Sequence, residues 1–300
     1  MKVLIYFLAY IGATVAIAVL LSYLVFLVIP HSLLAYLGWA QIRFHKLVHI
    51  VFLLVAVIGL WPLLKSLGLA ARNDLGFGVS LRTFLKATGV GIIVGLAILA
   101  SLVIVLVVFG VRVIDTHVLL YSPAFISIVV KALFSGLLVG LIEETLVRGA
   151  FFSVAGKVLN ATGTILFTAF VYAAVHFIRP RIEIPVDQVG WLSGLTVLMD
   201  SFRSYWHLAF LDSFLALLGA GIFLGLVRFK TGHIGYCVGI HAGWVLSIKL
   251  TKQLTQRNYD SDLAFLVGYY DGIIGYLALG WLAVASLMYY FLYVRRVAVS

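Results

Sequence analysis

The stretch ATGVGIIVGLAILASLVIVLVVFGV, residues 87–111, decides the class of fold because no charged side chain interrupts it. About 18 consecutive apolar residues are enough for a helix to cross the ~30 Å hydrocarbon core of a bilayer. Comparable runs recur along the 300 residues, of which 64% are hydrophobic and only 11% are charged. A water-soluble core of this size could not bury so much apolar side chain, so the sequence predicts an all-α, polytopic membrane protein.

Outward from that stretch, the hydropathy pattern predicts a bundle of about eight transmembrane helices. Their expected ranges are 3–29, 47–64, 87–111, 123–147, 160–178, 208–228, 232–250 and 271–293. Lys230, Thr231 and Gly232 are expected to form a tight turn between the sixth and the seventh helix. The runs lack the alternation that is typical of the strands of a membrane β-barrel.

The net charge of +10 raises the question of which partner the chain binds. Its basic residues are scattered through the predicted loops and form no basic stripe and no aromatic–basic module, so nucleic acid is not an expected partner. Cations that flank membrane helices explain the charge better, because an anionic membrane surface attracts them. The lipid bilayer is therefore the first expected partner. The single cysteine, Cys237, excludes an internal disulfide framework.

Seven ionisable residues are candidates for positions at lipid depth, where such groups are costly and by default indicate a functional site. Lys131 and Asp212 have simpler explanations, because a lysine can extend to the interface or pair with a carboxylate, and Asp212 lies near a helix end. The other five need a physical reason for their position: Glu143, Glu144, Arg148, His176 and His241.

The motif LIEETLVRG, residues 141–149, places two adjacent glutamates and an arginine in one helix. Glu144 and Arg148 are four residues apart with the acid on the N-terminal side, which is the favoured orientation for an ion pair. Glu143 points ~100° away from Glu144 around the helix and has no cation on its own helix face. We therefore expect Glu144 and Arg148 to support the structure and Glu143 to act as a general base or acid.

His176 is the predicted partner of Glu143. If the helices before and after Asn160 form an antiparallel hairpin, the depths of Glu143 and His176 differ by only ~1.5 Å. Tyr172 is one helical turn before His176, so its ring is expected to form a wall of the same site.

His241 lies well inside its helix in the stretch GIHAGWV, flanked by Gly239 and Gly243, which permit close approach of another backbone. Together with Glu143 and His176 it forms a set that could bind Zn²⁺, since histidines and carboxylates are zinc ligands. The usual zinc-helix motif, HExxH, is absent from the sequence. We favour a site without a cofactor and keep a zinc site made by the same three residues as the alternative.

Three motifs follow one another along the chain: EExxxRG, an aromatic residue four positions before a histidine, and a later histidine in an apolar helix. They are carried by Glu143, Glu144, Arg148, Gly149, Tyr172, His176 and His241. In this order they resemble the CAAX protease and bacteriocin-processing family, also called Abi proteins, which includes the type II CAAX prenyl endopeptidases. The resemblance divides the chain into motif-free membrane helices at 1–122, a catalytic helix core at 123–250, and a loop with the last helix at 251–300.

The resemblance implies an intramembrane endopeptidase that cleaves a peptide or membrane-protein substrate near the membrane surface. Glu143 and His176 would activate a water for attack on the peptide carbonyl, and His241 would help to hold the oxyanion. Glu144 and Arg148 would be structural support. The expected setting is the inner, cytoplasmic membrane of a bacterium.

One position departs from the family pattern, in which an asparagine or aspartate follows the last histidine by four residues. Val245 stands there, so Ser247, the indole N–H of Trp244 or a backbone amide near Gly243 would have to replace the lost donor. Loss of one oxyanion donor costs ~2.7–4 kcal/mol in a well-studied protease. A weak or inactive member that acts as a membrane scaffold or peptide binder is therefore one alternative function, and a proton-coupled transporter is another.

Overall fold

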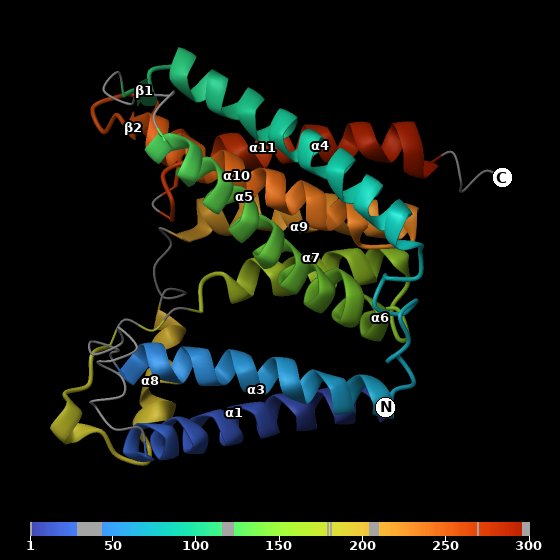
Figure 1. Ribbon diagram of the computed structural model, residues 1–300, viewed down its shortest axis with the longest axis vertical. Coiled ribbons are helices and arrows are strands. Elements are labelled where there is room, and N and C mark those ends of the chain that lie inside the picture. Colours follow the sequence, from blue (N-terminus) through green and yellow to red (C-terminus); the bar gives the residue numbers. More distant parts are fainter. Residues whose placement is uncertain are drawn as a thin grey trace. The chain divides into compact units, whose positions relative to one another are not determined.

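The computed structural model describes residues 2–28, 44–115, 123–178, 180, 182–203, 210–268 and 270–295. Its regular structure is almost entirely helical (Figure 1). The chain divides into two compact units. The first consists of Met1–Ala70 and Val175–Leu208, and the second consists of Ala71–Ala174 and Ala209–Ser300.

The first unit is built on two long helices and one short helix that packs on both. The Tyr10 hydroxyl donates a hydrogen bond to the Ala56 carbonyl at 2.7 Å and so ties the long helices together. Val197 of the short helix is fully buried in the small core of this unit. In chain order the elements are α1 (Lys2–Val28), α3 (Phe44–Ser66), η2 (Val186–Gln188) and α8 (Ser193–Ser201).

The second unit contains most of the helices and the two glutamates of the predicted site. Helix α10 packs against α4 and α5, and α9 packs against α11 (Figure 1). In chain order the elements are α4 (Leu81–Val108), β1 (Arg112–Ile114), α5 (Pro123–Glu144), η1 (Thr145–Phe151), α6 (Phe152–Ala155), α7 (Ala161–Val175), α9 (Leu211–Thr231), α10 (Gly235–Leu254), β2 (Thr255–Arg257), η5 (Ala264–Leu266), α11 (Tyr276–Tyr289) and η6 (Tyr290–Val294).

Helix α10 lies so close to α4 that only glycine fits at several positions of their contact. A Cβ added at Gly91 would lie 2.5 Å from the Tyr236 carbonyl oxygen, and one added at Gly243 would lie 2.6 Å from the Ile92 carbonyl oxygen. This confirms the close backbone approach that the glycines around His241 predict. The contact with α4 therefore fixes the helix that carries His241.

One end of the second unit is closed by a two-stranded antiparallel sheet, in which Arg112 of β1 lies opposite Arg257 of β2. The Arg112 guanidinium is buried and donates to Thr255 Oγ1 at 2.6 Å and to the Gly272 carbonyl at 2.8 Å. Because these acceptors belong to β2 and to the loop before α11, Arg112 holds that loop against the sheet. We call this end the cap end.

The helices confirm the all-α, polytopic class, and helices occur at all eight predicted positions. Among the described residues, six helices are long and apolar enough to cross a membrane. Helix α7 has only 15 residues, and α10 has 20 but carries a histidine and two lysines. The six are found over Ala9–Val28, Phe44–Ser66, Leu81–Val108, Phe125–Ala155, Leu211–Thr231 and Tyr276–Val294, so the chain is a multi-pass integral membrane protein.

Several predicted helix boundaries are wrong, among them the start of α11, which lies at Tyr276 rather than at residue 271. Helix α4 begins at Leu81 rather than at residue 87, because the Ser80 side chain accepts a hydrogen bond from Thr83 N–H and so caps the helix. Helix α7 ends at Val175 rather than at residue 178. The turn between the sixth and seventh helices comes later than predicted, because Lys230 and Thr231 still belong to α9 and the helix is capped by Gly232, whose φ of +75° is left-handed.

Candidate active site

The end of α5 carries the two adjacent glutamates, and the helix changes type directly after them. Glu144 is its last α-helical residue, and Thr145–Phe151 form the π-helix η1. π-Helical turns are rare in proteins, and those that occur are often found at functional sites. Here the backbone of the π-helix has a partner outside its own helix, because Arg228 Nε of α9 donates to the Arg148 carbonyl oxygen at 2.9 Å.

Glu144 and Arg148 form the predicted ion pair. Arg148 Nη1 lies 3.2 Å from Glu144 Oε1, and both side chains are 0% exposed. Arg148 Nη2 also donates to the Gly221 carbonyl of α9 at 3.1 Å, and the guanidinium lies over the Tyr172 ring, 4.5 Å from its centre. A buried ion pair is tolerated when further hydrogen bonds satisfy its donors. The pair therefore links α5 and η1 to α9 and α7.

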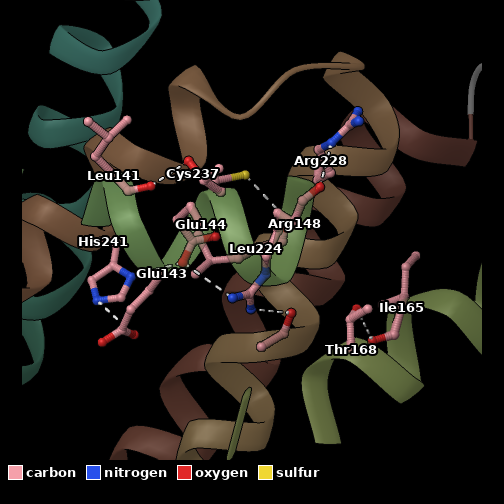
Figure 2. Close-up of polar contacts among 12 residues, drawn as sticks. Leu141, Glu143, Glu144, Arg148, Ile165, Thr168, Leu224, Arg228, Cys237 and His241 are labelled. Atoms are coloured by element: carbon pink, nitrogen blue, oxygen red, sulfur yellow. Dashed lines mark hydrogen bonds and ion pairs between the residues drawn. The ribbon is translucent and has the colours of Figure 1, made fainter. Parts of the chain in front are cut away.

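His241 brings the two glutamates into one site. Its Nδ1 lies 2.9 Å from Glu144 Oε1, and its Nε2 lies 3.9 Å from Glu143 Oε2 (Figure 2). Because an ionised carboxylate can only accept, we assign the proton of the shorter contact to Nδ1. Glu144 therefore holds the imidazole ring in an orientation that directs Nε2 toward Glu143.

The two carboxylates have different surroundings although they are neighbours in sequence. Glu144 is fully buried between Arg148 and His241, whereas the Glu143 side chain is 35% exposed. Two carboxylates, one guanidinium and one protonated imidazole would give a set without net charge, which is the combination that a low-dielectric interior tolerates best. Glu143 is the most exposed member of the set.

Tyr172 lines the site from α7. Its ring is buried and meets the His241 ring edge-to-face at 6.1 Å between centroids. The same ring lies beneath the Arg148 guanidinium. An aromatic ring in contact with both groups excludes water from one side of the ion pair, which strengthens the electrostatic interactions there.

The structure places His176 directly after α7, because the helix ends one residue earlier, at Val175. The predicted position of this histidine inside a helix is therefore wrong. The side chain is half-buried. His176 belongs to the first unit, whereas Glu143 and His241 belong to the second. The predicted approach of His176 to Glu143 stays a prediction.

Val245 takes part in the contact between α10 and α5. A Cβ added at Gly136 of α5 would lie 3.4 Å from the Val245 Cβ. Two residues predicted to replace the missing oxyanion donor lie close to Val245 in the sequence, and both are buried. Trp244 Nε1 and Ser247 Oγ have no hydrogen-bond partner among the residues that the structure describes. Each therefore has a hydrogen left to donate, and both stay candidates for the missing oxyanion donor.

A metal centre would need a convergent set of ligands. Within the described ranges, no group of three or more His, Cys, Asp or Glu side chains is arranged to hold a metal ion. His45 and His49 are four residues apart on α3, and no third ligand in those ranges joins them. The zinc alternative needs His176 beside Glu143 and His241, and it stays a prediction, as does the cofactor-free site.

Sequence reasoning missed the hydrogen bond between Glu144 and His241. Helical spacing relates residues of one helix, whereas these two lie 97 positions apart on α5 and α10. One available signal was the adjacency of the glutamates, since a single imidazole has two nitrogens that can address two carboxylates. The simpler explanations for Lys131 and Asp212 agree with the structure: Lys131 is exposed, and Asp212 lies in the first turn of α9.

A comparison with known families matches residues 125–247 to the model described as Type II CAAX prenyl endopeptidase Rce1-like. The matched span contains every residue on which the predicted resemblance depends, so that resemblance is confirmed. No curated protein and no solved structure shows significant similarity to the chain.

Proposed function

Because the core of this chain, residues 125–247, belongs to the Rce1-like family of type II CAAX prenyl endopeptidases, we propose that the chain is an intramembrane endopeptidase that uses a glutamate-activated water. The family is one of CAAX-type proteases, and the chain crosses the membrane several times. One observation carries the finer assignment. Glu143 and His241 Nε2 lie 3.9 Å apart in an apolar helix bundle, with the imidazole held from behind by Glu144.

This distance suits a shared oxygen atom. At 3.9 Å the two groups are too far apart for a direct hydrogen bond, but one oxygen can lie about 2.8 Å from both. A water satisfies that geometry, because it can donate to the Glu143 carboxylate and accept from His241 Nε2–H. Glu143 therefore takes the role of general base, and His241 that of a donor to the developing oxyanion.

In the proposed step Glu143 removes a proton from the water while the water oxygen bonds to the peptide carbonyl carbon. The carbonyl electron pair moves to its oxygen, and protonated His241 stabilises that oxyanion through Nε2–H. The carbonyl re-forms when the C–N bond breaks, and Glu143 returns the proton to the leaving nitrogen. His176 is assigned to orient the same water. The inner membrane of a bacterium stays the expected setting.

The test compares cellular membranes that contain the natural chain, the Glu143→Gln variant or the Glu183→Gln variant. Glu183 is the third glutamate of the chain and is exposed in the first unit. Mass spectrometry should find new peptide termini with the natural chain and with Glu183→Gln. Removal of the general base should reduce their formation by at least ~100-fold. Undiminished cleavage by a folded Glu143→Gln variant would contradict the proposal.

Two further arms of this assay examine the other parts of the assignment. His176→Ala should lose cleavage to a similar degree while the protein stays folded, and full activity would remove His176 from the mechanism. Treatment with a metal chelator should leave cleavage unchanged. Loss of cleavage with the chelator and its return with added Zn²⁺ would favour the metal-dependent alternative over the cofactor-free site.

The second candidate function is a catalytically weak or inactive peptide binder. Val245 is the residue that supports it. Val245→Asn places a polar donor four residues after His241 with little change in volume, so we expect the rate of peptide cleavage to rise by ~10-fold or more if a donor is missing. The matched control is Ile248→Asn, about one turn further along α10 and half-buried like Val245. A rise only with Val245→Asn would show that the natural chain lacks a donor. An unchanged rate would show that another group, such as Trp244 or Ser247, supplies it.

A further inference from the structure

The end of the second unit opposite the cap end is strongly basic. It is formed by the loop before α4, the start of α4, the residues between α6 and α7, the turn between α9 and α10, and the end of η6 (Figure 1). We call it the basic end. Its accessible cations are Arg72, Arg82, Lys86, Lys157, Lys230 and Arg295, of which only Lys230 is half-buried and the rest are exposed.

The cations of the basic end have no ion-pair partner among the described residues. Within the described part of the chain, none of the six forms an ion pair or a side-chain hydrogen bond. The acid of the same end is Asp74, and its Oδ2 accepts a hydrogen bond from Ala71 N–H at 3.1 Å. An excess of positive charge therefore faces the surroundings.

The cap end differs in both respects. Its described acids are Asp115, Asp212, Asp260, Asp262 and Asp271. Two of its arginines bind backbone carbonyls inside the protein, since Arg112 donates to Gly272 and Arg257 donates to Gly268. Its accessible lysines are fewer, and Lys249 donates to Ser135 Oγ. A count over the whole sequence hides this asymmetry because it includes the arginines that the fold uses internally.

Exposed apolar side chains stand next to cations of the basic end, at the start of α4 and in the turn after α6. Leu81 and Leu85 are 71% and 59% exposed beside Arg82 and Lys86, and Val158 is 60% exposed beside Lys157. Apolar groups exposed beside lysines and arginines are typical of the boundary between hydrocarbon and headgroups, where the stems lie in the apolar region and the charges reach the phosphates.

We propose that the basic end binds the anionic headgroups of the membrane leaflet that surrounds it, and that this leaflet is the cytoplasmic one. A cluster of four to eight lysines and arginines at the end of membrane helices is the expected signature of anionic-lipid binding, and cytoplasmic ends carry the excess of these residues. The surface is independent of the protease assignment, because none of the six cations belongs to the site.

The orientation determines the side from which the site is reached. His241 lies ~9 Å along α10 from Gly235 at the basic end and ~20 Å from Leu254 at the cap end. The paired residues Glu143 and His241 are therefore nearer to the basic end. Given the proposed protease function, on which this last step rests, a polypeptide enters the site from the leaflet that carries the anionic lipids.

The lipid surface is tested with the full chain in nanodiscs of phosphatidylcholine mixed with phosphatidylglycerol. Two triple variants each remove three exposed positive charges: Arg82→Gln, Lys86→Gln and Lys157→Gln at the basic end, against Lys131→Gln, Lys249→Gln and Lys252→Gln elsewhere. Native mass spectrometry counts the lipids retained on the released protein. Each cation removed from the basic end should weaken phosphatidylglycerol retention about 5-fold, and added salt should weaken retention by the natural chain. Equal loss in both triple variants, or none in either, would overturn the proposal.

The orientation is measured separately by cysteine labelling. The single cysteine, Cys237, is buried and is replaced by serine. Val158→Cys then marks the basic end and Asp260→Cys marks the cap end, both at exposed positions. In intact cells a membrane-impermeant maleimide should label only Asp260→Cys, and Val158→Cys should react only after permeabilisation. The reverse pattern would contradict the assignment of the basic end to the cytoplasmic leaflet.

Discussion

Replacement of Arg148 by methionine is expected to lower the free energy of unfolding by about 3–5 kcal/mol. Methionine fills a comparable space, but it leaves the buried Glu144 carboxylate without its guanidinium partner and the Gly221 carbonyl without the Arg148 donor. Removing one partner of a buried pair costs more than the pair contributes, because the remaining charge stays desolvated. Chemical denaturation of the purified protein in detergent micelles measures the change.

An exposed arginine supplies the matched control. Arg203 lies 3.9 Å from Asp200, and its side chain is 71% exposed, so Arg203→Met should change stability by less than about 1 kcal/mol. The double variant Glu144→Gln/Arg148→Met should lose less unfolding free energy than the Glu144→Gln and Arg148→Met variants lose together. Neither partner of the ion pair is then left as an unpaired charge. A loss with Arg148→Met no larger than with Arg203→Met would show that Arg148 is not the counterion of Glu144.

Two glycines of α4, only two residues apart, should respond to alanine in opposite directions. A Cβ at Gly91 would lie 2.5 Å from the Tyr236 carbonyl oxygen and 3.0 Å from the Gly239 Cα, so Gly91→Ala should cost about 3 kcal/mol by forcing α4 and α10 apart. Gly89 has nothing within 4 Å of the added atom. Gly89→Ala should stabilise the helix by about 0.5–1 kcal/mol, because alanine loses less backbone entropy on folding.

The glycine pair also tests how α10 is held. Thermal unfolding monitored by circular dichroism gives the sign of each change, and cleavage of a membrane substrate reports the position of His241. We expect Gly91→Ala to lower cleavage as well as stability, since displacement of α10 moves the imidazole away from Glu143. Equal stability of the two variants would mean that the contact between α4 and α10 is looser than described.

Periodicity within one helix predicted much of this molecule. The apolar runs indicated the membrane helices, the four-residue spacing indicated the pair of Glu144 and Arg148, and the glycines around His241 indicated a close helix neighbour. Each of these properties depends on the repeat of a single helix or on the width of a bilayer. A pattern of this kind can be recognised without the neighbouring segments.

The features that the sequence did not reveal depend on contacts between distant segments. His241 reaches Glu144 across 97 positions, and Arg228 donates to the backbone of η1 across 80. Nothing in the letters TLVRGAF distinguishes a π-helix from an α-helix. The early end of α7 at Val175 likewise has no glycine or proline beside it as a signal. Such choices are set by tertiary partners rather than by local preference.

The π-helix directly after Glu144 has a consequence for the phase of the whole helix. A π turn completes a circle with more residues than an α turn, so each surplus residue shifts every later side chain by about 100° relative to an unbroken α-helix. Glu143 and Glu144 keep the phase of α5. Gly149, within the π-helix, contacts the Leu75 backbone, and a Cβ added at Gly149 would lie 2.8 Å from the Leu75 carbonyl oxygen. Deletion of one residue within Thr145–Phe151 would therefore rotate Phe152–Ala155 about the axis and leave the glutamates in place. An insertion or deletion in the π-helix would therefore rotate the helix that follows it, whereas the same change in a loop would only lengthen or shorten the loop.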